Sequence, residues 1–185
     1  MAYQTMWFDT EIPEDLVDII EREINHYEDK SNTASISSGI DKEIRDSKTA
    51  WISDNHWVPG LCMSYVLKAN NDNFQYDITG IDGGEMQYTI YEEGMFYDWH
   101  LDAGVEAFQG NDAVRKLSII VQLSSPEDYE GGEVELINES GHPYFVPKKR
   151  GTLIVFDSRT KHRVKEVSSG KRKSLVGWVV GPRWK

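Results

Sequence analysis

The sequence lacks most features that stabilise small secreted proteins or fix proteins in membranes. Cys62 is the only cysteine among 185 residues, so no disulfide can form within the chain, and a secreted fold built on disulfides is excluded. No run approaches the roughly 20 apolar residues that cross a bilayer. The first residues, MAYQTMWFDTEIPEDL, contain no basic segment followed by an apolar one, as a signal peptide would. We therefore expect a soluble, cytoplasmic protein without a membrane partner.

Positive charge is also scarce. The chain has 20 lysines and arginines against 31 aspartates and glutamates, which gives a net charge of −11. Such a field repels phosphates at long range and disfavours a nucleic acid as partner, although residues 161–185 are locally basic. A neutral or basic peptide or protein suits this charge better.

The chain has enough apolar material for one core. Hydrophobic residues make up 39% and aromatic residues 11%, and the length favours a single domain over residues 1–185. Pro13 and an apolar stripe at three- and four-residue steps predict a helix over 12–30, and a second helix is predicted over 61–72. Short β-branched or aromatic segments separated by turn residues predict strands further on: 74–81, 86–93, 116–124, 132–140, 151–157 and 174–181.

Helices followed by a run of strands predict an α+β fold class. In this arrangement residues 1–73 are mainly a helical support and residues 74–185 form a jelly-roll core. Barrels of this kind open at one end, where strand ends and loops can present ligands.

The stretch MFYDWHLDAG, residues 95–104, places His100 and Asp102 two positions apart. Side chains at this spacing point the same way on a strand, so both can bind one ion, although a loop aspartate capping an amide is the simpler alternative. His162 begins the next predicted strand after GTLIVFD, and two histidines with one carboxylate form the facial triad of non-haem Fe(II) sites. Ten residues later, Arg172 precedes an apolar strand. A guanidinium inside a barrel needs a partner, and the terminal carboxylate of a dicarboxylic acid would be a bidentate one.

Four segments carry a family resemblance: YxxGxFYxWHxD at 91–102, and residues 115–136, 150–164 and 170–182. They resemble the 2-oxoglutarate/Fe(II)-dependent oxygenases, and within them the prolyl 4-hydroxylase-like group of bacteria and phages. The resemblance covers residues 86–182 closely and the N-terminal third loosely. It implies a double-stranded β-helix, a cupin-like jelly-roll barrel supported by N-terminal helices. It also implies Fe(II) on His100, Asp102 and His162, with 2-oxoglutarate and O2 as cosubstrates and ascorbate as an accessory cofactor.

The resemblance further implies which residues bind the cosubstrate. Arg172 would bind the C5 carboxylate of 2-oxoglutarate, and Tyr91 would hydrogen-bond the same molecule. Ser174 could add a hydroxyl to that carboxylate, and Gln122 occupies a position where some relatives carry a tyrosine that contacts it. Simpler interpretations stay open, namely a core aromatic for Tyr91 and satisfied polar groups of the barrel for Gln122 and Ser174.

Substrate contacts are predicted on aromatic residues around the same site. Tyr97 and Trp99 would line a cleft for an extended chain, Trp178 would wall the pocket besides packing in the core, and the loop 103–114 would act as a lid. Similarity to prolyl hydroxylases implies hydroxylation of a C–H bond, most readily of a proline in a peptide or protein, with succinate and CO2 as products. The alternatives are a free amino acid or other small metabolite as substrate, or a jelly-roll protein that binds metal or ligand without catalysis.

Overall fold

The structure is a computed structural model that describes residues 7–36, 39–103 and 113–184. Helix α1 (Glu14–Ile24) continues into a 3-10 helix, η1 (Asn25–Lys30), and α2 (Trp57–Ala69) continues into a π-helix, η2 (Asn70–Phe74). Both predicted helices are confirmed. The second begins earlier than predicted because the ring of His56 accepts a hydrogen bond from the Val58 N–H at 3.3 Å and caps the first turn. No helix within the described ranges is long and apolar enough to cross a bilayer.

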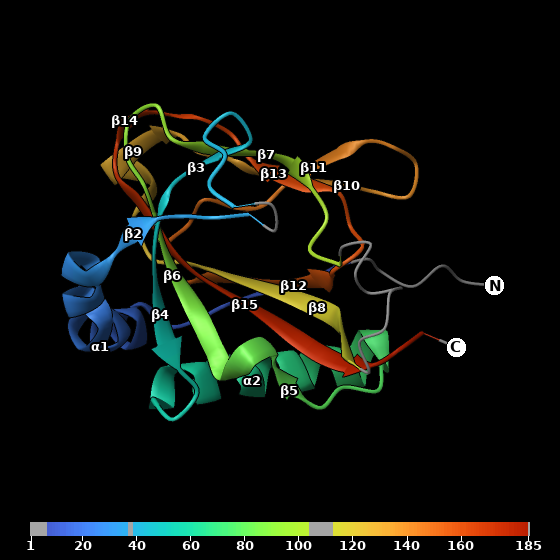
Figure 1. Cartoon of the computed structure of the whole chain (residues 1–185). Coiled ribbons are helices and arrows are strands. Elements are labelled where there is room, and N and C mark those ends of the chain that lie inside the picture. The colour runs from blue at the N-terminus through green and yellow to red at the C-terminus, as the bar shows by residue number, and fades with distance from the viewer. Residues whose placement is uncertain (1–6, 37–38, 104–112, 185) are drawn as a thin grey trace.

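Two antiparallel sheets face each other, and the helices cover the outer face of the larger one (Figure 1). The large sheet has the order β1 (Trp7–Glu11), β12 (Thr152–Asp157), β8 (Ala113–Gln122), β15 (Arg172–Pro182), β6 (Glu85–Tyr91), β4 (Lys48–Ser53) and β2 (Asn32–Thr33), with β5 (Gly80–Ile81) on β15. The small sheet has the order β11 (Pro143–Phe145), β10 (Val134–Ile137), β13 (His162–Val164), β7 (Phe96–His100) and β3 (Arg45–Asp46). Strands β9 (Tyr129–Gly131) and β14 (Val167–Gly170) form a separate pair. This is the predicted jelly-roll class of fold.

The large sheet is apolar on both faces, which is why its strands lack simple alternation of polar and apolar residues. Leu175 and Val179 of β15 pack with α1 and α2 in one buried cluster. Ile120 of β8 and Phe156 of β12 belong to a second cluster, between the two sheets. The face toward the small sheet also carries the polar residues of the candidate site, so the fold encloses them.

The N-terminal part differs from the prediction of a mainly helical support. Residues 1–73 also supply β1, β2, β3 and β4, of which β1 pairs with β12 and β4 pairs with β6. These strands were missed because their partners lie far away in the sequence. The strand predicted over 74–81 shortens to β5, since the side chain of Asn70 binds both backbone groups of Tyr76 and holds this stretch in a turn. In the predicted lid 103–114, residues 104–112 lie outside the described residues, and Ala113 already belongs to β8.

Candidate metal and cosubstrate site

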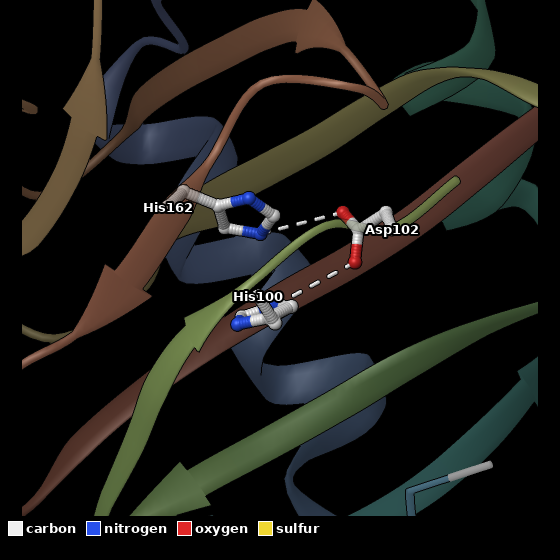
Figure 2. A group of neighbouring side chains, drawn as sticks. All are labelled: His100, Asp102 and His162. Carbon is white, nitrogen blue, oxygen red and sulfur yellow. Dashed lines mark ion pairs between the residues drawn. The ribbon is translucent and has the colours of Figure 1, made fainter. Parts of the chain in front are cut away.

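The structure brings His100, Asp102 and His162 together. His100 is the last residue of β7 and His162 the first of β13, and the two residues are opposite each other in the antiparallel pair. The chain then turns so that the N–H groups of Asp102 and Ala103 both donate to the carbonyl of Ser158, at 3.1 and 2.9 Å. One ligand atom from each of the three side chains lies within 4.8 Å of the others (Figure 2). This is the spacing that a single metal ion requires of three ligands.

Backbone carbonyls orient both imidazole rings. Nδ1 of His100 lies 2.7 Å from the carbonyl oxygen of Asp98, and Nδ1 of His162 lies 2.9 Å from that of Thr160. Since a carbonyl only accepts, each Nδ1 carries the proton and donates it. Each Nε2 is thereby directed toward Asp102, and these atoms lie 3.7 and 3.4 Å from its two carboxylate oxygens. A carbonyl or carboxylate that accepts the Nδ1 proton is the usual support of a metal-binding histidine, because it fixes the orientation of the ring.

The ionisation states also suit a metal. Burial, followed by the nearby His162, lowers the pKa of His100 to about 4, so this ring is neutral at physiological pH. Burial opposes the ionisation of Asp102, but His162, His100 and a hydrogen bond from Ser118 outweigh it and hold the pKa of this carboxyl below its usual value. The Ser118 hydroxyl donates to Oδ2 of Asp102 at 2.7 Å. One carboxylate and two imidazoles form a donor set that fits Fe(II).

A β-bulge decides which aromatic side chains reach the cluster. The register between β7 and β13 shifts so that three steps on β7 oppose two on β13. Tyr97 therefore shares a face with His100, and their rings stack at 3.5 Å between centroids. Trp99 instead lies under the guanidinium of Arg163, 4.5 Å from its ring, and beside the ammonium of Lys161. The structure does not bring Trp99 to the candidate ligands.

The residues predicted to bind the cosubstrate form a second group on the inner face of the large sheet. Arg172 is 1% exposed and lies opposite Tyr91, whereas Ser174 lies opposite Gln122. Nη2 of Arg172 donates to Oε1 of Gln122 at 2.8 Å, and Nη1 donates to the Ser174 hydroxyl at 3.4 Å. Its Nε and the amide nitrogen of Gln122 have no partner, and within the described part of the chain no carboxylate pairs with this guanidinium. Since a buried cation without an anion is costly, this group fits a carboxylate ligand.

Trp178 lies near the candidate metal ligands. It is opposite Ser118 on the neighbouring strand, and Ser118 is hydrogen-bonded to Asp102. The guanidinium of Arg115 stacks 4.1 Å from the Trp178 ring. The sequence analysis did not identify Ser118 or Arg115, although Ser118 could have been found because it precedes Gln122 by four residues on the same face of one predicted strand.

The comparisons agree with this arrangement. A family model described as the 2OG-Fe(II) oxygenase superfamily matches residues 86–180. A PKHD-type hydroxylase of Parvibaculum lavamentivorans is 42% identical over 89 residues, which are 48% of this chain and 38% of that protein. A PKHD-type hydroxylase of Acaryochloris marina is 43% identical over 94 residues, 50% of this chain and 40% of that protein. The chain thus spans about two fifths of the length of these curated relatives.

Solved structures share the fold of the whole chain. A prolyl-4-hydroxylase of Pseudomonas putida superposes with a TM-score of 0.76 at 23% identity, and the match covers 96% of this chain and 93% of that one. A prolyl hydroxylase of Trichoplax adhaerens, solved with a peptide fragment of a hypoxia inducible factor, gives a TM-score of 0.76 at 19% identity over 94% and 83%. At these identities the likeness establishes the double-stranded β-helix fold alone.

Proposed function

The chain belongs to the 2OG-Fe(II) oxygenase superfamily, and we propose that it acts as a dioxygenase that hydroxylates a C–H bond and converts 2-oxoglutarate to succinate and CO2. One observation carries this proposal. Three candidate metal ligands meet within 4.8 Å, and a buried guanidinium without a carboxylate projects from the face of the large sheet on which Ser118 contacts Asp102. A barrel that binds a metal without catalysis would have no need for the buried guanidinium of Arg172.

In the proposed site, His100, Asp102 and His162 hold Fe(II), which together with 2-oxoglutarate and O2 supplies the oxidant. The Nδ1–H groups of both imidazoles are fixed on backbone carbonyls, which directs each Nε2 toward the site. Ser118 holds the carboxylate of Asp102 in place. Three protein ligands leave the remaining coordination positions to the cosubstrates.

Arg172 would anchor the far carboxylate of 2-oxoglutarate through a bidentate, charge-assisted pair. Its unpaired Nε and the free amide nitrogen of Gln122 supply donors that the protein alone leaves unused. Ser174 and Tyr91 border the same guanidinium and would contribute hydroxyl groups. Ascorbate would serve only as a reductant that keeps the iron ferrous.

For the substrate, we propose a prolyl residue in a peptide or protein. The two solved neighbours are prolyl hydroxylases, and one of them was solved with a peptide. Tyr97 and Trp178 lie next to the candidate ligands and offer aromatic surfaces on which a pyrrolidine ring can pack. With Trp99 on the other face of β7, these two residues remain as the proposed substrate contacts.

The test is formation of succinate from 2-oxoglutarate with Fe(II), ascorbate and O2, first without and then with proline peptides or free proline. The variants Asp102→Ala and His162→Ala should reduce succinate at least 100-fold, whereas Asp72→Ala and His142→Ala make the same changes at surface positions and should retain it. Turnover that survives loss of Asp102 or His162 would contradict the proposed site. Turnover stimulated by free proline but not by peptides would mean that the substrate is a free amino acid, while the proposed reaction would stay the same.

A further inference from the structure

A cavity of about 240 Å³ lies beside the outer strands of the large sheet, apart from the candidate metal ligands. We call it the β4-edge pocket. Its walls come from η1, β2, β4 and β6 and include Tyr27, Lys30, Asn32, Ser35, Trp51 and Gln87. Strand β2 covers the edge of β4 only at Lys48 and Thr49, so the pocket adjoins an uncovered stretch of strand edge. The proposed metal and cosubstrate site uses none of these side chains.

The lining of the pocket mixes apolar and polar groups, and its one charged side chain, Lys30, is positive. Among the described residues that line it there is no aspartate or glutamate, although the chain has 31 acidic residues. The Lys30 ammonium lies 5.2 Å from the centre of the Tyr27 ring and, within the described ranges, forms no ion pair. Hydroxyl and amide groups of Ser35 and Asn32 add hydrogen-bonding capacity. These groups suit a carboxylate better than a cation or an apolar side chain.

Hydrogen bonds fix the side chain of Gln87, which forms the floor of the pocket. Oε1 of Gln87 accepts hydrogen bonds from Nη2 of Arg45 at 2.7 Å and from the Thr89 hydroxyl at 3.1 Å. Arg45 is itself buried and stacks 4.7 Å from the ring of Tyr97, which covers His100. The pocket is therefore preformed and joined through packed side chains to the candidate metal site.

An aromatic surface leads from the pocket to the candidate metal site. Trp51 is 46% exposed, and its ring lies 6.3 Å from that of Trp178. Trp178 is in turn opposite Ser118, the partner of Asp102. The strands run β8, β15, β6, β4, so three strand spacings, roughly 14 Å, separate Ser118 from the edge of the sheet at β4. An extended peptide covers that distance in about four residues.

We propose that the β4-edge pocket binds an acidic side chain of a peptide substrate, about four residues from the hydroxylated residue. This inference rests on the proposed function and specifies its substrate. The net charge of −11 attracts basic peptides from a distance and does not repel neutral ones, while Lys30 selects an aspartate or glutamate at one position. The two effects act over different distances and together define a basic or neutral peptide with one acid at a fixed spacing.

The experiment uses a degenerate peptide library with one central proline and six randomised positions on each side. Peptides are incubated with the full chain, Fe(II), 2-oxoglutarate and ascorbate, and products heavier by one oxygen atom are sequenced by mass spectrometry. The wild type should enrich aspartate and glutamate about two- to five-fold at one position three to five residues from the proline, as expected for a partly exposed charge pair. Lys30→Glu should reverse the preference to lysine and arginine at that same position.

Lys68→Glu is the matched control, because it makes the same charge change on α2, where Lys68 pairs with Asp72 away from the pocket. It should keep the wild-type preference. Hydroxylated products without an acidic preference, or an unchanged preference in Lys30→Glu, would overturn this inference and leave the proposed function standing. Succinate measured without and with peptides or free proline tests that function separately, and its absence from all of these reactions would refute both proposals. Succinate without any hydroxylated peptide would refute the peptide substrate and this pocket assignment together.

Discussion

Replacing Arg172 with methionine should separate the stability of the fold from the binding of the cosubstrate. The guanidinium is buried, and its hydrogen bonds go to the neutral side chains of Gln122 and Ser174. Replacing buried charges with apolar side chains of similar size is often neutral or stabilising by about 1–4 kcal/mol. The substitution leaves Oε1 of Gln122 without its donor, which costs about 1–3 kcal/mol. Without 2-oxoglutarate, the free energy of unfolding of the Arg172→Met variant should therefore stay within about 3 kcal/mol of the wild type. Adding Gln122→Leu removes the acceptor that was left without a donor, so the double variant should be more stable than Arg172→Met alone.

Binding of 2-oxoglutarate, unlike the stability of the fold, should weaken strongly in the Arg172→Met variant. Loss of one partner of a buried, hydrogen-bonded charge pair costs about 2–5 kcal/mol, which weakens 2-oxoglutarate binding by roughly 30- to 5,000-fold. At 100 times its Kd the ligand stabilises the wild type by about 2.7 kcal/mol. At the same concentration it should stabilise the Arg172→Met variant by less than about 1 kcal/mol. The Kd of the variant is raised at least about 30-fold, so this ligand concentration is then no more than about three times its Kd.

Urea unfolding under anaerobic conditions, with Fe(II) and with or without 2-oxoglutarate, measures both quantities. Arg172→Lys is the control, since it keeps a positive charge but loses the planar fork, and it should retain part of the ligand effect. Collapse of the Arg172→Met variant without ligand would mean that the guanidinium serves the fold rather than a ligand. Undiminished stabilisation by 2-oxoglutarate would place its carboxylate elsewhere.

Two buried groups of the site and one buried cysteine of the core give three further predictions. Ser118→Ala should weaken Fe(II) binding about 10-fold in anaerobic titrations, because Asp102 loses its hydrogen-bond donor, and equal affinity would show that this bond orients nothing. Because the pKa of His100 falls to about 4 by burial, the unfolded chain takes up this proton first, so the metal-free protein should lose up to about 3 kcal/mol of stability as the pH falls from 6.5 to 4. His100→Gln should flatten that dependence in urea unfolding, and parallel curves for the two proteins would refute the assignment. Burial raises the pKa of Cys62 to about 12, so iodoacetamide at pH 8 should label it only after unfolding, and fast labelling of the native protein would mean that α2 does not bury this residue against the large sheet.

Much of the candidate site could be predicted because its residues sit at the ends of strongly patterned strands. The buried run TLIVFD marks β12, and His162 follows after one turn. His100 and Asp102 follow the aromatic strand β7. Arg172 begins β15, the longest apolar segment of the C-terminal region. The local sequence pattern therefore predicts that each of these residues lies at the end of a strand. The family resemblance indicates that together they form one site.

Other features depend on contacts between distant parts of the chain. Strand β1 forms only against β12, so the short segment WFDTE carries little signal of its own. The bulge in β7 brings Tyr97 to the face of His100 although the two are three residues apart, and alternation along the sequence cannot reveal such a shift of register. Arg45 reaches Gln87 and Tyr97 only because β3 joins the small sheet, and the β4-edge pocket depends on the same packing.

Anaerobic titration with Fe(II), with bound iron counted after dialysis, tests most directly whether two imidazoles and one carboxylate form a metal site. The wild type should bind one Fe(II) per chain, and Asp102→Ala and His162→Ala should each bind at least 10-fold more weakly. A wild-type chain that takes up no Fe(II), or variants that bind it as tightly as the wild type, would contradict the account.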